Sequence, residues 1–150
     1  MKIRESGMPV RGMWEGFFDP HHVIVTLGIN KRTRDVAEFG CGYGTFTIPA
    51  AKVIRGQIYA LDIETEMIRS TDEEAKKQVL NNVRAILRDF MAEGSGLLDE
   101  SVDYVMLFNI LHLENPWTLL SEAKRILIKN GRLGIVHWNY GPTTPRGHPH

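Results

Sequence analysis

The feature that most limits how this chain can fold is the segment Val36–Thr45, which reads VAEFGCGYGT. An apolar run comes first, glycine then stands at every second position (Gly40, Gly42 and Gly44), and a helix-like stretch follows. Glycine adopts positive φ at no steric cost and leaves room for another group to approach the backbone. The segment therefore predicts a strand, a tight turn and a helix whose N-terminus favours a negative or polar ligand group.

Strand-like and helix-like segments alternate along the rest of the chain. Strands are expected at 35–39, 57–63, 83–88, 102–108 and 132–138, and helices at 45–53, 65–79 and 116–128. A shorter helix, from Pro20 to about Leu27, has Asp19 as its expected N-cap and Gly28 after its end. Asn130-Gly131 is expected to cap the helix 116–128.

This alternation defines the expected fold class, which is α/β with a doubly wound, mostly parallel sheet. Because the strands carry long apolar runs, helices should cover both faces of the sheet. Ligands of such sheets bind at the carboxyl ends of the strands, beside the switch point. The glycine segment follows the first strand, so it lies where this rule places a ligand.

Length and charge set the remaining bounds. The 150 residues predict one domain, with an N-terminal arm and helix over 1–30 and a tail over 140–150. Eighteen basic residues balance eighteen acidic ones, and no basic stripe marks a nucleic-acid partner. The single cysteine excludes an intrachain disulfide, and neither a secretory signal nor a membrane span is expected. We expect a cytoplasmic protein with no membrane partner.

The glycine spacing separates two kinds of nucleotide-binding loop. The dinucleotide fingerprint is G-x-G-x-x-G, whereas here the third glycine comes one position early. The stretch Glu38-Phe39-Gly40-Cys41-Gly42-Tyr43-Gly44 instead resembles the first motif, [D/E]-x-G-x-G-x-G, of the S-adenosylmethionine-dependent methyltransferases of the Rossmann-like class. A tight turn without a ligand is the alternative interpretation.

Later strand ends extend this resemblance over about residues 14 to 140. Asp62 ends the second strand, where the family has an acid that accepts hydrogen bonds from both ribose hydroxyls; a helix N-cap is the alternative. Arg88-Asp89-Phe90 ends the third strand, where a family acid binds the adenine amino group; a loop cap is the alternative. The fourth strand ends in Phe108-Asn109-Ile110-Leu111-His112, which resembles the fourth motif of the family.

The resemblance implies a bound S-adenosylmethionine, S-adenosylhomocysteine as its product, and a methyl group transferred to a second substrate. The fourth motif lacks the [D/N/S]-P-P-[Y/F] signature and the Pro-Cys nucleophile of base-methylating enzymes, so a small-molecule acceptor is expected. No metal is expected. The cofactor-binding residues that it implies are Glu38, Phe39, Gly40, Cys41, Gly42, Tyr43, Gly44, Asp62, Ile63, Asp89, Phe90 and Asn109.

Several side chains are candidates for the acceptor half of the site. His112 is the candidate general base, with packing or a loop hydrogen bond as its alternative, and His137 is expected to be a structural histidine of the fifth strand. Three aromatic residues, Trp14, Phe17 and Tyr43, either roof the cofactor or pack in the core. Core or pocket-wall positions are expected for Trp117 and Trp138.

The C-terminal end departs from the family pattern. Family members continue past the fifth strand with a helix and two further strands, and here the segment 132–138 becomes an exposed edge. Truncation, pairing with a second copy of the chain, or cover by the tail would each account for such an edge. Two further functions are carried as alternatives, a non-catalytic S-adenosylmethionine-binding module and a nicotinamide-dependent oxidoreductase.

Overall fold

A computed structural model of the chain describes residues 11, 12, 16 and 19–137. Its strands are β1 (Val36–Phe39), β2 (Ile58–Asp62), β3 (Val83–Leu87), β4 (Val102–Phe108) and β5 (Leu127–Val136). Its helices are α2 (Pro20–Thr26), α3 (Thr47–Val53), α4 (Thr65–Lys77), α5 (Phe90–Glu93) and α6 (Pro116–Ile126). The expectations for Trp14, Phe17, Trp138 and the tail 140–150 lie outside the described residues.

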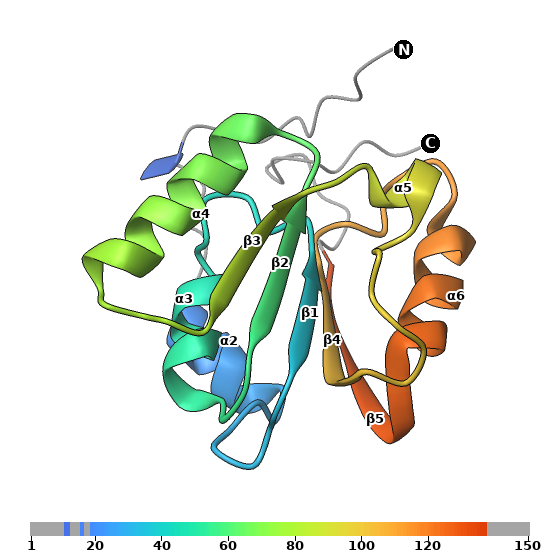
Figure 1. The fold of residues 1–150 in the computed structure, drawn as a ribbon, viewed down its shortest axis with the longest axis horizontal. Coiled ribbons are helices and arrows are strands. Elements are labelled where there is room, and N and C mark those ends of the chain that lie inside the picture. Colours follow the sequence, from blue (N-terminus) through green and yellow to red (C-terminus); the bar gives the residue numbers. More distant parts are fainter. Residues whose placement is uncertain (1–10, 13–15, 17–18, 138–150) are drawn as a thin grey trace.

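The five strands form one parallel sheet in the order β3-β2-β1-β4-β5, as the doubly wound prediction required. Figure 1 shows α2, α3 and α4 on one side of the sheet and α5 and α6 on the other. The chain moves outward from β1 to β3 and then crosses back to β4, so the switch point lies between β1 and β4. The carboxyl ends of all five strands therefore meet at one edge, beside that point.

Successive residues of β1 supply both halves of the core, because side chains alternate between the faces of a strand. Val36 belongs to a hydrophobic cluster with residues of α2 and α3, whereas Ala37 and Phe39 belong to a second cluster with residues of α5 and α6. All four residues of β1 are buried. The central strand is thus fixed from both faces, and the loop that leaves it starts from a rigid position.

Most predicted element boundaries agree with the structure to within two residues, and β4 agrees at both ends. The helix after Asp19 is confirmed, since the Asp19 side chain accepts a hydrogen bond from the backbone N–H of His22 at 3.2 Å and Pro20 occupies the first position. The short helix α5 was not predicted, because four residues carry no periodic signal.

The boundary between α6 and β5 differs from the sequence prediction, which placed the helix at 116–128 and the strand at 132–138. The helix ends at Ile126, and Leu127 already pairs with Val102 of β4. Asn130-Gly131 is therefore not a helix cap; Asn130, with φ of 66°, lies in an irregular stretch of β5 before regular pairing resumes at Arg132. Burial of Ile126 and pairing with β4 end the helix earlier than its local sequence suggests.

Strand β5 forms an edge of the sheet, as expected. Among the described residues no strand pairs with its outer side, and Leu133 and Ile135 on it are exposed. None of the described helices has the length and apolar character needed to cross a membrane.

Candidate cofactor site

The glycine loop, residues 40–46, joins β1 to α3 at the carboxyl edge of the sheet. The backbone N–H groups of Gly40 and Cys41 both donate to the carbonyl oxygen of Leu61, at 2.7 and 3.0 Å. The N–H of Gly44 donates to the carbonyl oxygen of Cys41 at 3.0 Å, which closes a turn. The two bonds to Leu61 fix the loop to the end of β2.

Neighbouring parts of the chain approach two of the three glycines closely. Gly40 has φ of 79°, and a Cβ there would lie 2.6 Å from Cδ1 of Ile110. Gly44 has φ of 87°, and a Cβ there would lie 3.3 Å from the Cα of Thr71. The close approach that excludes side chains therefore comes in part from the loop after β4 and from α4.

Asp62, at the end of β2, is 3% exposed and accepts hydrogen bonds on both carboxylate oxygens. Oδ2 accepts from the N–H of Gly42 at 2.9 Å, and Oδ1 accepts from the N–H of Glu64 at 3.0 Å. Burial raises the pKa of Asp62, and the two backbone donors oppose that rise. Each carboxylate oxygen offers two acceptor sites, so capacity for a ribose diol remains beside half-buried Ile63.

Glu38 lies beneath the loop, where its buried side chain accepts a hydrogen bond from the hydroxyl of Thr47. Burial raises the pKa of Glu38 to about 8; the Thr47 hydrogen bond opposes this rise and the nearby charge of Asp62 adds to it. Burial also raises the pKa of the Cys41 thiol, with further contributions from Glu38 and Asp62. Within the described part of the chain, the charged neighbours that act on Glu38, Cys41 and Asp62 are acids, an arrangement that fits a cationic ligand group such as a sulfonium or an ammonium.

At the end of β3, Asp89 caps α5 by accepting from the N–H of Ala92 at 3.1 Å. The ring of Phe90 is buried and meets the ring of Phe39 edge to face, with centroids 5.1 Å apart. The side chains of Phe39 and Phe90 thus belong to the core, and the adenine contacts expected of Asp89 and Phe90 stay predictions.

Asn109 follows β4 directly and is 3% exposed, with φ of 55°. Its backbone N–H donates to the carbonyl oxygen of Val136 at 2.6 Å. Within the described part of the chain, its buried side-chain Oδ1 and Nδ2 atoms have no hydrogen-bond partner. A buried amide without partners costs about 1–3 kcal/mol, so this position fits a polar group of a ligand.

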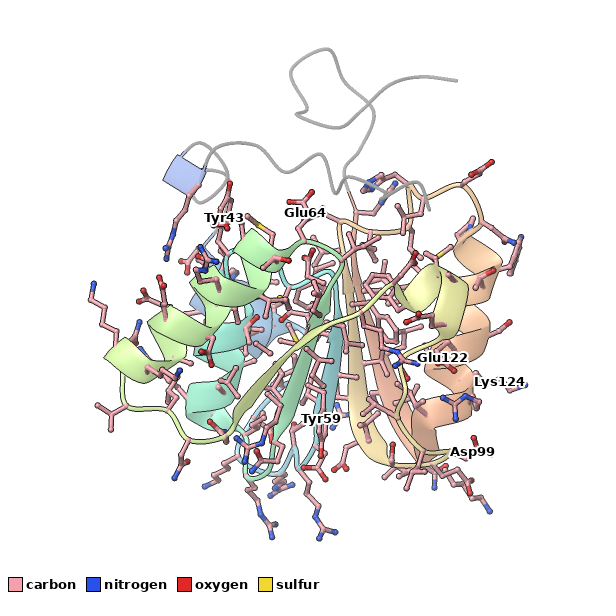
Figure 2. All side chains as sticks on the ribbon, turned by 45° about the horizontal axis from the view of Figure 1, so that its top comes forward. Tyr43, Tyr59, Glu64, Asp99, Glu122 and Lys124 are labelled. Carbon is pink, nitrogen blue, oxygen red and sulfur yellow. The ribbon has the colours of Figure 1, made fainter. Side chains whose placement is uncertain are left out.

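The candidate residues for the acceptor half are more exposed than the buried residues around the glycine loop. His112 is exposed in the loop between β4 and α6, where its catalytic role stays a prediction. The expectation that His137 is a structural histidine of the fifth strand is wrong, because β5 ends at Val136 and His137 is exposed. Trp117 is 73% exposed on α6 and is not a core residue. Tyr43 is half-buried, and Figure 2 shows it with Glu64 at the carboxyl edge of the sheet.

The structure adds two residues that the sequence interpretation missed. Thr47 on α3 and Thr71 on α4 are both buried, and their hydroxyls donate to Glu38 and to the carbonyl oxygen of Gly42, respectively. A signal for Thr71 existed, since it stands four residues from both Met67 and Ala75 on the buried face of α4. A polar residue on such a face needs a partner.

The chain matches a family model described as a methyltransferase domain over residues 37–135, which span β1 to β5. It belongs to this family, the S-adenosylmethionine-dependent methyltransferases of the Rossmann-like class. A solved structure of a S-adenosylmethionine-dependent methyltransferase from Aquifex aeolicus superposes with a TM-score of 0.74 at 27% identity, over 86% of this chain and 68% of that one. The cofactor of the family is S-adenosylmethionine.

Two curated relatives differ in the acceptor that their names state. Ribosomal RNA small subunit methyltransferase A of Desulforapulum autotrophicum is 28% identical over 111 residues, which cover 74% of this chain and 37% of that protein. Demethylmenaquinone methyltransferase of Geobacillus stearothermophilus is 29% identical over 104 residues, which cover 67% of this chain and 42% of that protein. The chain thus spans about two fifths of the length of these relatives.

Proposed function

We propose that this chain binds S-adenosylmethionine at the carboxyl edge of its sheet and transfers the methyl group to a small-molecule acceptor. The observation that carries the proposal is the pair of buried acids beside the glycine loop at the switch point: Asp62 accepts from the N–H of Gly42, and Glu38 accepts from Thr47 directly after the loop. Burial keeps Glu38 neutral below about pH 8 in the ligand-free protein, and a cationic ligand group beside it would favour the ionised form. The donor carries two such groups, a sulfonium and an ammonium.

Different residues would contact different parts of the donor molecule. The Gly40–Gly44 loop would lie along the methionine part, with Glu38 beneath it. Asp62 would accept from the ribose hydroxyls with its remaining lone pairs, and Ile63, Asp89 and Phe90 would border the adenine. Donor chemistry is supplied by the cofactor, which carries an electrophilic methyl group.

The acceptor half would lie across the switch point, after β4. Here Asn109 offers a buried amide, and exposed His112 could take a proton from a hydroxyl or amine near neutral pH. In-line transfer requires the acceptor atom to lie roughly 3–3.5 Å from the methyl carbon. The balanced charge and the absence of a Pro-Pro-aromatic sequence after Asn109 support a small metabolite over a nucleic acid.

Calorimetric titration with S-adenosylmethionine and S-adenosylhomocysteine tests the donor site. Asp62→Ala should weaken both ligands by about 1–3 kcal/mol, because polar groups lose their partner. Asp72→Ala is the matched control, since the side chain of Asp72 on α4 is only partly buried and pairs with Lys76 at the surface. Absence of heat and of a thermal shift for both ligands with the unaltered chain would refute the donor site.

A turnover assay with the labelled donor tests the acceptor. The panel contains hydroxyl, thiol, amine and arsenical small molecules, with ribosomal RNA and ribosomal protein as the competing classes. Methylation of RNA or protein alone would contradict the small-molecule acceptor. Donor binding without any product would favour a non-catalytic binding module, and binding of NAD in place of S-adenosylmethionine would favour an oxidoreductase.

A further inference from the structure

One side chain of α4 contacts three residues of the glycine loop. Thr71 is 0% exposed, and its hydroxyl donates to the carbonyl oxygen of Gly42 at 2.9 Å. The thiol of Cys41 lies 3.5 Å from the same hydroxyl. Gly44 packs against the backbone of Thr71 so closely that a Cβ on Gly44 would lie 3.3 Å from the Thr71 Cα. Thr71 therefore meets three loop residues from a helix outside the loop.

Gly42 is held through both of its backbone polar groups. Its N–H donates to Asp62 at the end of β2, at 2.9 Å, and its carbonyl oxygen accepts from Thr71 on α4, also at 2.9 Å. The residue has φ of 55°, a left-handed conformation that these two bonds maintain. The orientation of the loop and the position of the Asp62 carboxylate are thus linked through one residue.

We infer that Thr71 is a positioning residue for donor binding, which acts by holding Gly42 and, through it, Asp62. The inference rests on the proposed donor site. A loop that is already ordered in the free protein saves the donor the entropy cost of ordering it. Without the hydroxyl, the buried carbonyl oxygen of Gly42 keeps only the weak thiol donor of Cys41, at 3.7 Å, and the loop can leave the geometry that the donor requires.

The test compares two threonine-to-valine variants, because valine keeps the shape of threonine and removes only the hydroxyl. Thr33 is a matched control: it is also buried, its Oγ1 accepts from the N–H of Asn30 at 3.1 Å, and it precedes β1 at the opposite edge of the sheet. Both Thr71→Val and Thr33→Val should lower the melting temperature. Only Thr71→Val should raise the calorimetric Kd for S-adenosylmethionine and S-adenosylhomocysteine, by about three- to thirtyfold.

Thr71→Ser separates the hydroxyl from the methyl group. It keeps the donor to Gly42, so its Kd should lie within about a factor of two of the unaltered chain. An unchanged Kd in Thr71→Val, with a melting temperature lowered as in Thr33→Val, would overturn the inference and leave the donor site intact. A weakened Kd in Thr71→Ser equal to that of Thr71→Val would also overturn it. Failure of the unaltered chain to bind either ligand would refute the proposed function itself.

Hydrogen exchange on the unaltered chain gives a second measurement that needs no variant. The Gly42 amide should be protected in the ligand-free protein, because its N–H is bound to Asp62 and its carbonyl to Thr71. Exchange of this amide at the rate of an open backbone would show that the loop is not held before the donor binds, and would overturn the inference.

Discussion

The buried carboxyl group of Glu38 makes a prediction about how stability depends on pH. The pKa of Glu38 is raised from 4.5 to about 8, mainly because burial penalises the charged form. Between these pH values the unfolded chain has released the proton and the folded chain still holds it. The folded state therefore loses stability as the pH rises through this window, and no further loss from this group occurs above about pH 8.

The magnitude follows from the two pKa values. Each pH unit in the window costs about 1.4 kcal/mol, so the total loss between pH 4.5 and about 8 is on the order of 5 kcal/mol. Glu38→Gln removes the titration and keeps an oxygen that can accept from Thr47. The variant and the unaltered chain should have similar free energies of unfolding near pH 5, and the variant should be several kcal/mol more stable near pH 8.

Urea denaturation at half-unit steps from pH 5 to 8.5 measures this difference. Other groups titrate alike in both proteins, so the difference between the two curves isolates Glu38. A difference that grows with pH at up to about 1.4 kcal/mol per unit agrees with a neutral carboxyl group in the folded chain. Parallel curves across the whole range would refute the reasoning and would mean that Glu38 is ionised in the folded protein.

Three further predictions concern the loop, the strand end and the sheet edge. Gly44→Ala should lower the free energy of unfolding by about 1–2 kcal/mol or more in urea denaturation, because of its positive φ and its contact with Thr71, whereas Gly12→Ala, with no atom within 4 Å of the new Cβ, should not. Asn109→Gly should raise the melting temperature, because glycine adopts the positive φ without strain and the unpartnered amide is removed. The same variant should slow methyl transfer in the turnover assay. A lowered melting temperature would contradict this account. If β5 pairs with a second copy of the chain, sedimentation should show concentration-dependent dimers that Leu133→Lys abolishes, and a monomer at every concentration would exclude that pairing.

The fold could be predicted from sequence because long apolar strands alternate with amphipathic helices. This pattern is visible within short stretches of the sequence. Strand β4 was predicted at both ends for that reason. The junction after Ile126 could not be predicted in the same way. Leu127 and Ile128 continue a helical pattern, and only the pairing of Leu127 with Val102, twenty-five residues earlier in the chain, turns them into a strand.

Some residues of the candidate site could be predicted from sequence and others could not, for the same reason. The glycine loop and Asp62 were located from spacing, because the loop follows β1 directly and Asp62 is the last residue of β2. The contacts of Thr47 and Thr71 join residues from separate elements, so spacing alone could not assign them. The same holds for Glu38, whose altered pKa comes from burial beneath the loop and is a property of the packed structure.

The central place of β1 in the sheet also has a consequence for how the chain acquires its structure. Val36 pairs with Ile58 on one side and with Tyr104 on the other, so the strand before the glycine loop is complete only when a much later segment arrives. Closure over such a distance is slow, and an open apolar strand is prone to wrong pairing while it waits. During synthesis, β1 would have one unpaired edge until β4 has emerged from the ribosome. Chaperones that bind exposed strands should therefore bind this chain most strongly before residue 102 leaves the ribosome.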